Sequence, residues 1–211
     1  MKRIIISEGK HDNLFLVNLL TKNLKIPKEQ ILSFDQNTSD SLKMLKYRET
    51  YYFEKLRDKW RNYKILIKSE NGKNNVIKVL QSRILDMFNF SYDPIFLIDL
   101  DYQKIDKFIT KFTSILKEKF KGEIHAKNIR FSINEETDNS YITMKSIKLE
   151  NSGRLFIIAF KKSLEYHIPQ LDNYTSADIK EQGSLIDNFI KGNKAICEPF
   201  IKALNVEHEK L

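Results

Sequence analysis

The chain has 211 residues, with 36 Lys or Arg against 28 Asp or Glu, so its net charge at neutral pH is +8. Hydrophobic residues make up 41% and charged residues 30%, a balance that excludes an intrinsically disordered chain. The single cysteine, Cys197, excludes an internal disulfide and the usual Cys/His zinc sites. No stretch approaches the roughly 18 apolar residues of a membrane span, and the first residues do not resemble a signal peptide, so we expect a cytoplasmic protein.

Strand-like and helix-like patterns alternate along the first 120 residues. Short apolar runs predict buried strands, and each is followed by a segment with helical periodicity. This alternation favours a mostly parallel sheet with right-handed crossovers, in an α/β, Rossmann-like fold flanked by helices. The predicted strands are 3–7, 30–34, 64–73 with its glycine turn, and 93–101, and the predicted helices are 11–24, 40–62, 74–88 and 104–120.

The second half of the chain is less regular. Residues 123–133 and 141–149 alternate in polarity around a polar turn at 134–140, which predicts an antiparallel hairpin. Residues 154–160 predict another buried strand, and two helical stretches follow. We therefore expect a core at 1–122 with a helical insertion at about 36–62, and a C-terminal α/β extension at 123–211 that packs on the core as one compact unit.

Acidic side chains follow two of the predicted parallel strands. Glu8 follows the first strand, and Asp99 and Asp101 end the strand at 93–101. Ligands of open parallel sheets bind beyond the carboxyl ends of the strands, so these carboxylates converge if the two strands are neighbours. Because Asp99 and Asp101 are two residues apart, extended backbone would point them the same way. Gly9 would allow a tight turn and the approach of a phosphate.

An oxygen-only cluster of this kind suits Mg²⁺ or Mn²⁺ and bridges to phosphate. Without a cation, repulsion between like charges would make the cluster unfavourable. The competing interpretation is that acidic residues after strands cap the next helix, as Asp12 or Asp101 could. For any one residue, capping is favoured; for the set in this order, the metal site is favoured.

These segments resemble the toprim domain. "IIISEGKHDNLFLVNLL" (4–20) is similar to its first motif and "PIFLIDLDY" (94–102) to its Asp-x-Asp motif. "ILIKSENGKNNVIKVLQS" (65–82) is similar to the third-strand segment of small toprim proteins and OLD-family nucleases. The resemblance covers roughly residues 1–120, apart from the insertion at 36–62, and it implies a toprim-like fold.

The resemblance assigns roles to the acidic residues. It makes Glu8 a metal ligand or the general acid/base of phosphoryl transfer, and it implies that Asp99 and Asp101 hold Mg²⁺. Asp12 would be a further ligand or a support for the loop. Glu165, in "KKSLEYHI", matches a Ser-Leu-Glu stretch of OLD-like proteins; we expect it on a helix surface rather than in a second acidic site.

Basic residues complete the candidate site. Lys10 and Lys73 lie at the same predicted edge and are expected to contact phosphate, or to be solvated lysines. Arg57 and Arg61 belong to an aromatic and basic helix at 46–64 that could bind nucleic acid through phosphate contacts and base stacking. Packing of these aromatic residues on the sheet or on another subunit is slightly favoured. His11 is expected to be a solvated histidine at a helix start.

The favoured function is Mg²⁺- or Mn²⁺-dependent phosphodiester chemistry on RNA or DNA by a small toprim nuclease. The alternative is a non-catalytic or weakly catalytic nucleic-acid-binding subunit of an RNA- or DNA-processing complex, which the net charge also favours. A receiver-like domain with Asp99 as phospho-acceptor fits poorly, because a receiver has paired acids after its first strand. We expect nucleic acid and no membrane as partner; a homodimer and a larger processing complex both stay open.

Overall fold

The computed structural model describes residues 2–34, 63–89, 92–119, 131–149, 153–173 and 178–205. The helical insertion expected at 36–62 and the expected boundary at residue 122 lie outside these residues. The described strands form one seven-stranded sheet in the order β2-β3-β1-β4-β7-β6-β5. They are β1 (Lys2–Ser7), β2 (Ile31–Phe34), β3 (Ile65–Ser69), β4 (Tyr92–Asp99), β5 (Phe131–Asp138), β6 (Ile142–Leu149) and β7 (Gly153–Phe160).

The sheet is mixed but mostly parallel. β1 is the middle one of the five parallel strands and pairs with β3 and with β4, while β2 and β7 extend the parallel part on either side. β6 and β5 then add antiparallel strands at the β7 edge. The expected α/β sheet with an antiparallel hairpin is confirmed, and the C-terminal strands continue the sheet of the N-terminal half.

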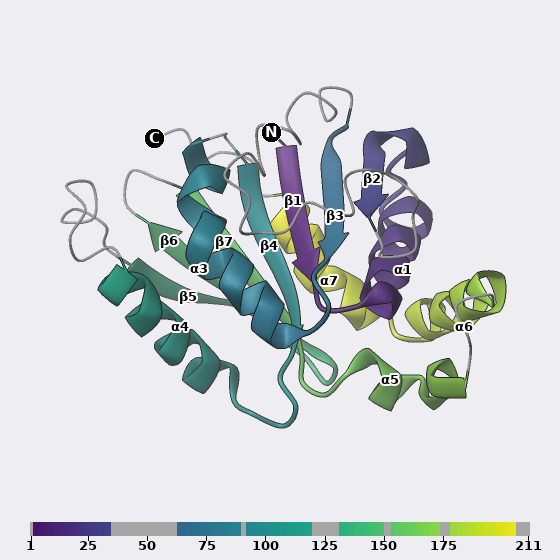
Figure 1. Cartoon of the computed structure of the whole chain (residues 1–211). Coiled ribbons are helices and arrows are strands. Elements are labelled where there is room, and N and C mark those ends of the chain that lie inside the picture. Colours follow the sequence, from purple (N-terminus) through teal and green to yellow (C-terminus); the bar gives the residue numbers. More distant parts are fainter. Residues whose placement is uncertain are drawn as a thin grey trace.

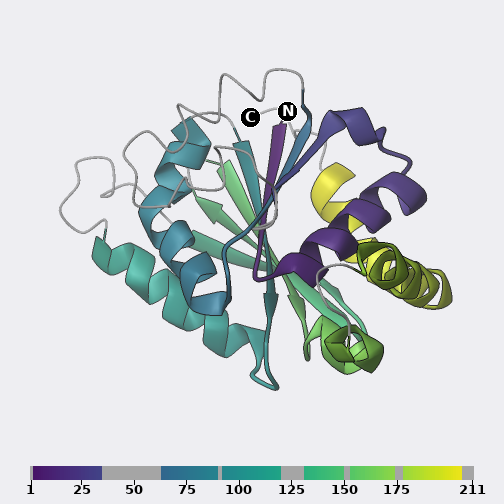
Figure 2. The same cartoon turned by 45° about the vertical axis from the view of Figure 1, so that its right-hand side comes forward.

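Helices cover both faces of the sheet, and Figure 2 shows the resulting three layers. α3 and α4 lie on one face, and α1, α6 and α7 lie on the other (Figure 1). The longer helices are α1 (Lys10–Asn18), α3 (Lys73–Asn89), α4 (Ile105–Lys119), α6 (Ile179–Gly192) and α7 (Cys197–Asn205). The short ones are α5 (Leu164–His167), a π-helical turn at Leu19–Asn23, and 3₁₀ turns at Lys28–Gln30, Pro169–Asn173 and Lys194–Ile196. Within the described segments, no helix has both the length and the apolar character that crossing a bilayer requires.

The central strands are apolar on both faces because both faces are covered. In β1, Ile4 and Ile6 pack on the α3 and α4 side, and Ile5 packs on the α1 side. This two-sided burial is typical of parallel strands and explains why "RIIIS" shows no alternation of polar and apolar residues. The register places each parallel carboxyl end at the same edge of the sheet.

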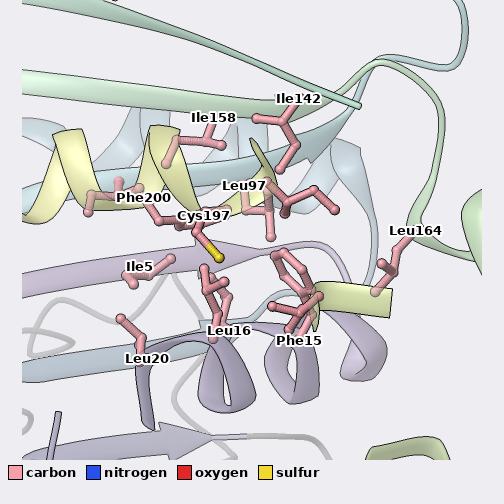
Figure 3. Packing of buried hydrophobic residues seen from close by; sticks show 14 of the residues in the cluster. Ile5, Phe15, Leu16, Leu20, Leu97, Ile142, Ile158, Leu164, Cys197 and Phe200 are labelled. Carbon is pink, nitrogen blue, oxygen red and sulfur yellow. The ribbon is translucent and has the colours of Figure 1, made fainter. Parts of the chain in front are cut away.

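The core on the α1 side is built around aromatic contacts. The ring of Phe15 makes edge contacts with Phe160 and Phe200, at centroid distances of 5.3 and 5.6 Å. Cys197 lies in this same apolar cluster (Figure 3). Burial raises the pKa of its thiol, so the lone cysteine is a packing residue of the α7 interface.

The hairpin turn lies later than the sequence pattern predicts. β5 runs to Asp138, and the chain reverses at 139–141 rather than at 134–140. The Asn139 side-chain Oδ1 accepts hydrogen bonds from the backbone N–H groups of Tyr141 and Ile142, both at 2.8 Å, and so fixes this tight turn. Residues 134–138 belong to the edge strand β5 instead, where the side chains of Asn134 and Asp138 are exposed.

A glycine with left-handed backbone at the start of β7 gives a prediction about stability. Gly153 has φ of +133°, and a Cβ there would lie 2.9 Å from Cδ1 of Phe88. We expect Gly153→Ala to lower the free energy of unfolding by about 1–3 kcal/mol, because both the backbone and the Phe88 contact become strained. Urea unfolding measures this. Gly192→Ala is the control, since a Cβ at Gly192 meets nothing within 4 Å; equal stability of the two variants would contradict the prediction.

Candidate functional site

The carboxyl ends of β1 and β4 bring two acidic residues into contact. The two strands are neighbours, as the convergence of the carboxylates requires. The Glu8 carboxylate Oε1 accepts a hydrogen bond from the backbone N–H of Asp99 at 2.9 Å. This bond joins residues 91 positions apart in the sequence. The two acids expected at one sheet edge therefore lie side by side.

Asp12 closes the loop between β1 and α1. Its Oδ2 accepts hydrogen bonds from the backbone N–H groups of Gly9, at 2.9 Å, and Glu8, at 3.1 Å. Its side chain is buried, and it satisfies backbone donors at the start of α1. The chain bends at Glu8 and Gly9, but Gly9 is extended, with φ of −144°, so this bend does not use a backbone conformation that only glycine favours. A Cβ at Gly9 would meet nothing within 4 Å.

Asp101 reaches the site from a turn rather than from the strand. β4 ends at Asp99, and Asp101 has φ of +46° and the next residue, Tyr102, φ of +66°. The expectation that extended backbone aligns Asp99 with Asp101 is therefore wrong, because the chain leaves the extended conformation between them. The exposed Asp101 carboxylate forms an ion pair with Lys73, the first residue of α3.

The β3–α3 loop is tied to the β1–α1 loop. The backbone N–H of Gly72 donates to the carbonyl oxygen of Glu8 at 2.8 Å, and the φ of Gly72 is +97°. The positive φ explains the need for glycine in the turn predicted after the third strand. This link holds the N-terminus of α3, and with it Lys73, beside the acidic residues.

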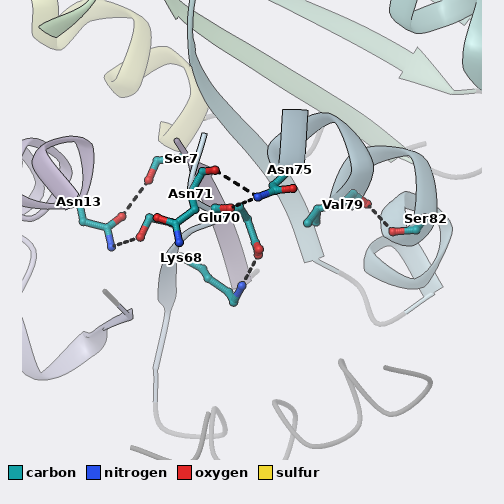
Figure 4. A network of polar contacts seen from close by, with 9 residues as sticks. Ser7, Asn13, Lys68, Glu70, Asn71, Asn75, Val79 and Ser82 are labelled. Carbon is teal, nitrogen blue, oxygen red and sulfur yellow. Dashed lines mark hydrogen bonds and ion pairs between the residues drawn. The ribbon is translucent and has the colours of Figure 1, made fainter. Parts of the chain in front are cut away.

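A buried polar network supports the same two loops (Figure 4). The hydroxyl of Ser7 donates to Oδ1 of Asn13 at 2.8 Å, and Nδ2 of Asn13 donates to Oγ of Ser69 at 3.4 Å. Nδ2 of Asn75 donates to the carbonyl oxygen of Glu70 at 2.9 Å. The strand ends and the helix starts are thus cross-linked by side chains, so the position of Glu8 is fixed from both sides.

Glu165 joins the site from α5, an element that the sequence does not place there, and meets His11 of α1. His11 Nδ1 lies 2.7 Å from Glu165 Oε1, and the His11 side chain is only 11% exposed. The expectation of a solvated histidine is wrong, whereas Glu165 lies in the short helix α5 with its side chain 30% exposed and pairs with His11. The reason is that β7 pairs with β4, which brings α5 to the carboxyl edge beside α1. Nε2 of His11 is buried without a hydrogen-bond partner among the described residues.

The carboxylates share one electrostatic environment. Burial raises the pKa of Asp99 to about 9, and the negative charges of Asp12 and Glu8 act in the same direction. Burial also raises the pKa of Asp12 to about 7 and raises the pKa of Glu8. The pKa of Glu165 is lowered, chiefly by its hydrogen bond to His11. The site therefore brings together carboxyl groups whose surroundings oppose their ionising together.

The other predicted contact residues are placed as follows. Lys10 is the first residue of α1, so it lies at the same edge as Lys73. Arg57 and Arg61 lie outside the described residues.

The donor chemistry at this edge suits a hard cation, since carboxylate oxygens are what Mg²⁺ and Mn²⁺ prefer. Among the residues described, however, no three His, Cys, Asp or Glu side chains stand close enough together to hold a metal ion. Binding of an ion therefore requires side-chain movement, for which the exposed Asp101 has room.

The raised pKa of Asp99 predicts a pH-dependent stability in the absence of divalent cations. A carboxyl with a folded pKa of about 9 and an unfolded pKa of about 4 stabilises the fold below pH 4 and loses this contribution as the pH rises to 9. We expect the free energy of unfolding of the wild type to fall more steeply between pH 6 and 9 than that of Asp99→Asn. Urea unfolding in EDTA measures both slopes.

Glu118→Gln is the matched control for charge removal, because Glu118 is exposed near the far end of α4. The free energy of unfolding of this variant should fall with pH as steeply as that of the wild type. If the free energy of unfolding fell equally steeply with pH in the wild type and in Asp99→Asn, the assigned environment of Asp99 would be contradicted.

The chain matches no protein-family model, no curated protein and no solved structure. The likeness to the toprim domain rests on the motif residues at 4–20, 65–82 and 94–102.

Proposed function

We propose that this chain carries out Mg²⁺- or Mn²⁺-dependent phosphodiester chemistry on nucleic acid, as a small toprim-like nuclease. The observation that carries the proposal is the convergence of Glu8, Asp99 and Asp12 at the carboxyl edge, with burial and repulsion raising all three pKa values. A fold optimised only for stability would not collect a buried carboxyl group and two half-buried ones without equal positive charge. A divalent cation would relieve this repulsion.

Glu8, Asp99 and Asp101 would hold the ion. Once bound, Mg²⁺ or Mn²⁺ would neutralise phosphate charge and make a bound water more acidic. Asp12 serves the site differently, because its Oδ2 holds the backbone that carries Glu8. It positions Glu8 by fixing the β1–α1 loop.

Glu8 is the residue best suited to move a proton. Burial raises its pKa toward neutral pH, where a general base works most efficiently. The hydrogen bond from the Asp99 N–H engages Oε1 and orients the carboxylate. Lys73, now paired with Asp101, would contact the substrate phosphate if the ion takes over Asp101. The net charge of +8 favours a polyanionic substrate in general.

Divalent cations should stabilise the wild type more than they stabilise Asp99→Asn. The ion relieves repulsion in the folded state and binds the unfolded chain weakly, so it raises the melting temperature by mass action. We expect a concentration-dependent rise with MgCl₂ or MnCl₂ that Asp99→Asn largely loses and Glu118→Gln retains. Thermal melts monitored by circular dichroism measure it, with NaCl at matched ionic strength as the control. A rise of equal size in all three proteins would contradict a metal site at Asp99.

Cleavage of nucleic acid tests the function directly. Labelled single-stranded and double-stranded RNA and DNA are incubated with the wild type, Glu8→Gln, Asp99→Asn and Glu118→Gln in Mg²⁺, Mn²⁺ or EDTA. We expect cleavage by the wild type and Glu118→Gln only with the metal. Glu8→Gln and Asp99→Asn should lose at least about 100-fold in rate, as expected when a general base or a charge-stabilising group is removed.

The competing function gives a different result in the same experiment. A non-catalytic subunit would bind nucleic acid without cleaving it, and Glu8→Gln would bind as well as the wild type. That outcome would overturn the nuclease proposal and favour a role inside a larger processing complex.

A further inference from the structure

Two exposed aromatic rings lie together beside the acidic site. Tyr102 is 73% exposed and Tyr166 is 52% exposed, although large aromatic side chains are usually covered. Their rings contact each other edge to face, with centroids 6.3 Å apart and planes at 82°. We call these two residues the tyrosine pair.

The fold places the tyrosine pair next to the carboxylates. Tyr102 directly follows Asp101 in the turn after β4, and Tyr166 directly follows Glu165 in α5. The pairing of β4 with β7 brings the two segments to the same edge of the sheet. The φ of Tyr102 is +66°, a conformation that is rare for an aromatic residue and that puts this ring against Tyr166 instead of along the strand direction.

A lysine lies over both rings. The Lys162 ammonium is 3.6 Å from the ring centroid of Tyr166 and 5.0 Å from that of Tyr102. Within the described part of the chain, this ammonium contacts the two rings and forms no ion pair with a carboxylate. The tyrosine pair thus carries a positive charge that an anionic ligand can contact.

We propose that the tyrosine pair and Lys162 bind the unpaired bases of a single-stranded nucleic acid at the rim of the acidic site. Ring faces stack on any base, and the ammonium contacts the adjoining phosphate. Paired bases inside a duplex are already stacked and do not offer their faces. This inference rests on the proposed function for the identity of the site, and it names the substrate class: single-stranded RNA or DNA, or an unpaired end.

Binding without metal separates the inference from the nuclease proposal. Fluorescence anisotropy in EDTA compares a labelled single-stranded oligonucleotide, the same strand made entirely abasic, and a duplex of equal length. The abasic strand keeps the phosphates and lacks the stacking partners. The proteins are the wild type, the double variant Tyr102→Ala/Tyr166→Ala and the matched variant Tyr102→Phe/Tyr166→Phe, which keeps both rings.

We expect the wild type to bind the single strand more tightly than the duplex or the abasic strand. The Ala variant should lose about 5- to 150-fold in affinity for the single strand, the range that loss of stacking on one base gives. The Phe variant should stay within about twofold of the wild type. Neither variant should change the affinity for the abasic strand. Thermal melts confirm folding, and Ile179→Ala, a substitution of an exposed residue on α6, is the control for loss of apolar surface.

Two results would overturn the inference and leave the nuclease proposal standing. One is metal-dependent cleavage by a wild type that binds the abasic strand as tightly as the single strand. The other is unchanged single-strand affinity of the Ala variant, which would assign the rings to a protein partner. Conversely, the wild type could bind the single strand in a way that depends on the two rings and cleave nothing with any metal. That result would support the inference about the tyrosine pair and overturn the nuclease proposal.

Discussion

The candidate site depends on the parallel pairing of β1 with β4. This pairing runs to Ile6 opposite Phe96 and brings the residue after β1 close to the carboxyl end of β4, where the hydrogen bond from the Asp99 N–H to the Glu8 carboxylate joins the two segments. Everything else at the edge is arranged around that bond. α1 and α3 begin beside it, and their loops are joined through the carbonyl oxygen of Glu8. A shift of one residue in this register would turn Asp99 to the opposite face of the sheet.

The two ends of the β1–β4 pair differ in whether their charged side chains are compensated. At the amino end, Arg3 on β1 forms a buried ion pair with Asp93 on β4, its partner in the register. At the carboxyl end, Glu8 and Asp99 meet without an equal number of positive charges. At the amino end, the charges of Arg3 and Asp93 compensate each other. At the carboxyl end, the lack of compensation lowers the free energy of unfolding. Such a cost is tolerated at sites where function requires it, which is why the unbalanced end is the functional candidate.

Periodicity and composition were sufficient to predict the main elements. The runs 3–7, 30–34 and 154–160 are strands, and the two-sided burial of β1 made its apolar run easy to recognise. The hairpin turn was misplaced because one amide side chain, that of Asn139, decides where the chain reverses. The same limit applies to Asp101, since a sequence pattern carries little information about a single residue with positive φ.

The predicted site was incomplete for a different reason. Glu8 follows β1 and Asp99 ends β4, so both acids could be placed at strand ends from the sequence, and their convergence required only that these two strands be neighbours. Glu165 and His11 meet only because β7 inserts beside β4, and strand order of that kind is a long-range property. The signal that could have found them is the position of Glu165, a carboxylate shortly after an apolar strand, like Glu8.

The position of β7 beside β4 also affects the order in which parts of the protein can fold. During synthesis, β1, β3 and β4 can pair before the C-terminal half has left the ribosome. Until β7 arrives, the open edge of β4 lacks a neighbour, and the His11–Glu165 pair and the tyrosine pair cannot form. An unfinished chain therefore carries the two central acids but not the residues that surround them. The acidic edge therefore gains its full set of contacts only once β7 and α5 have been made.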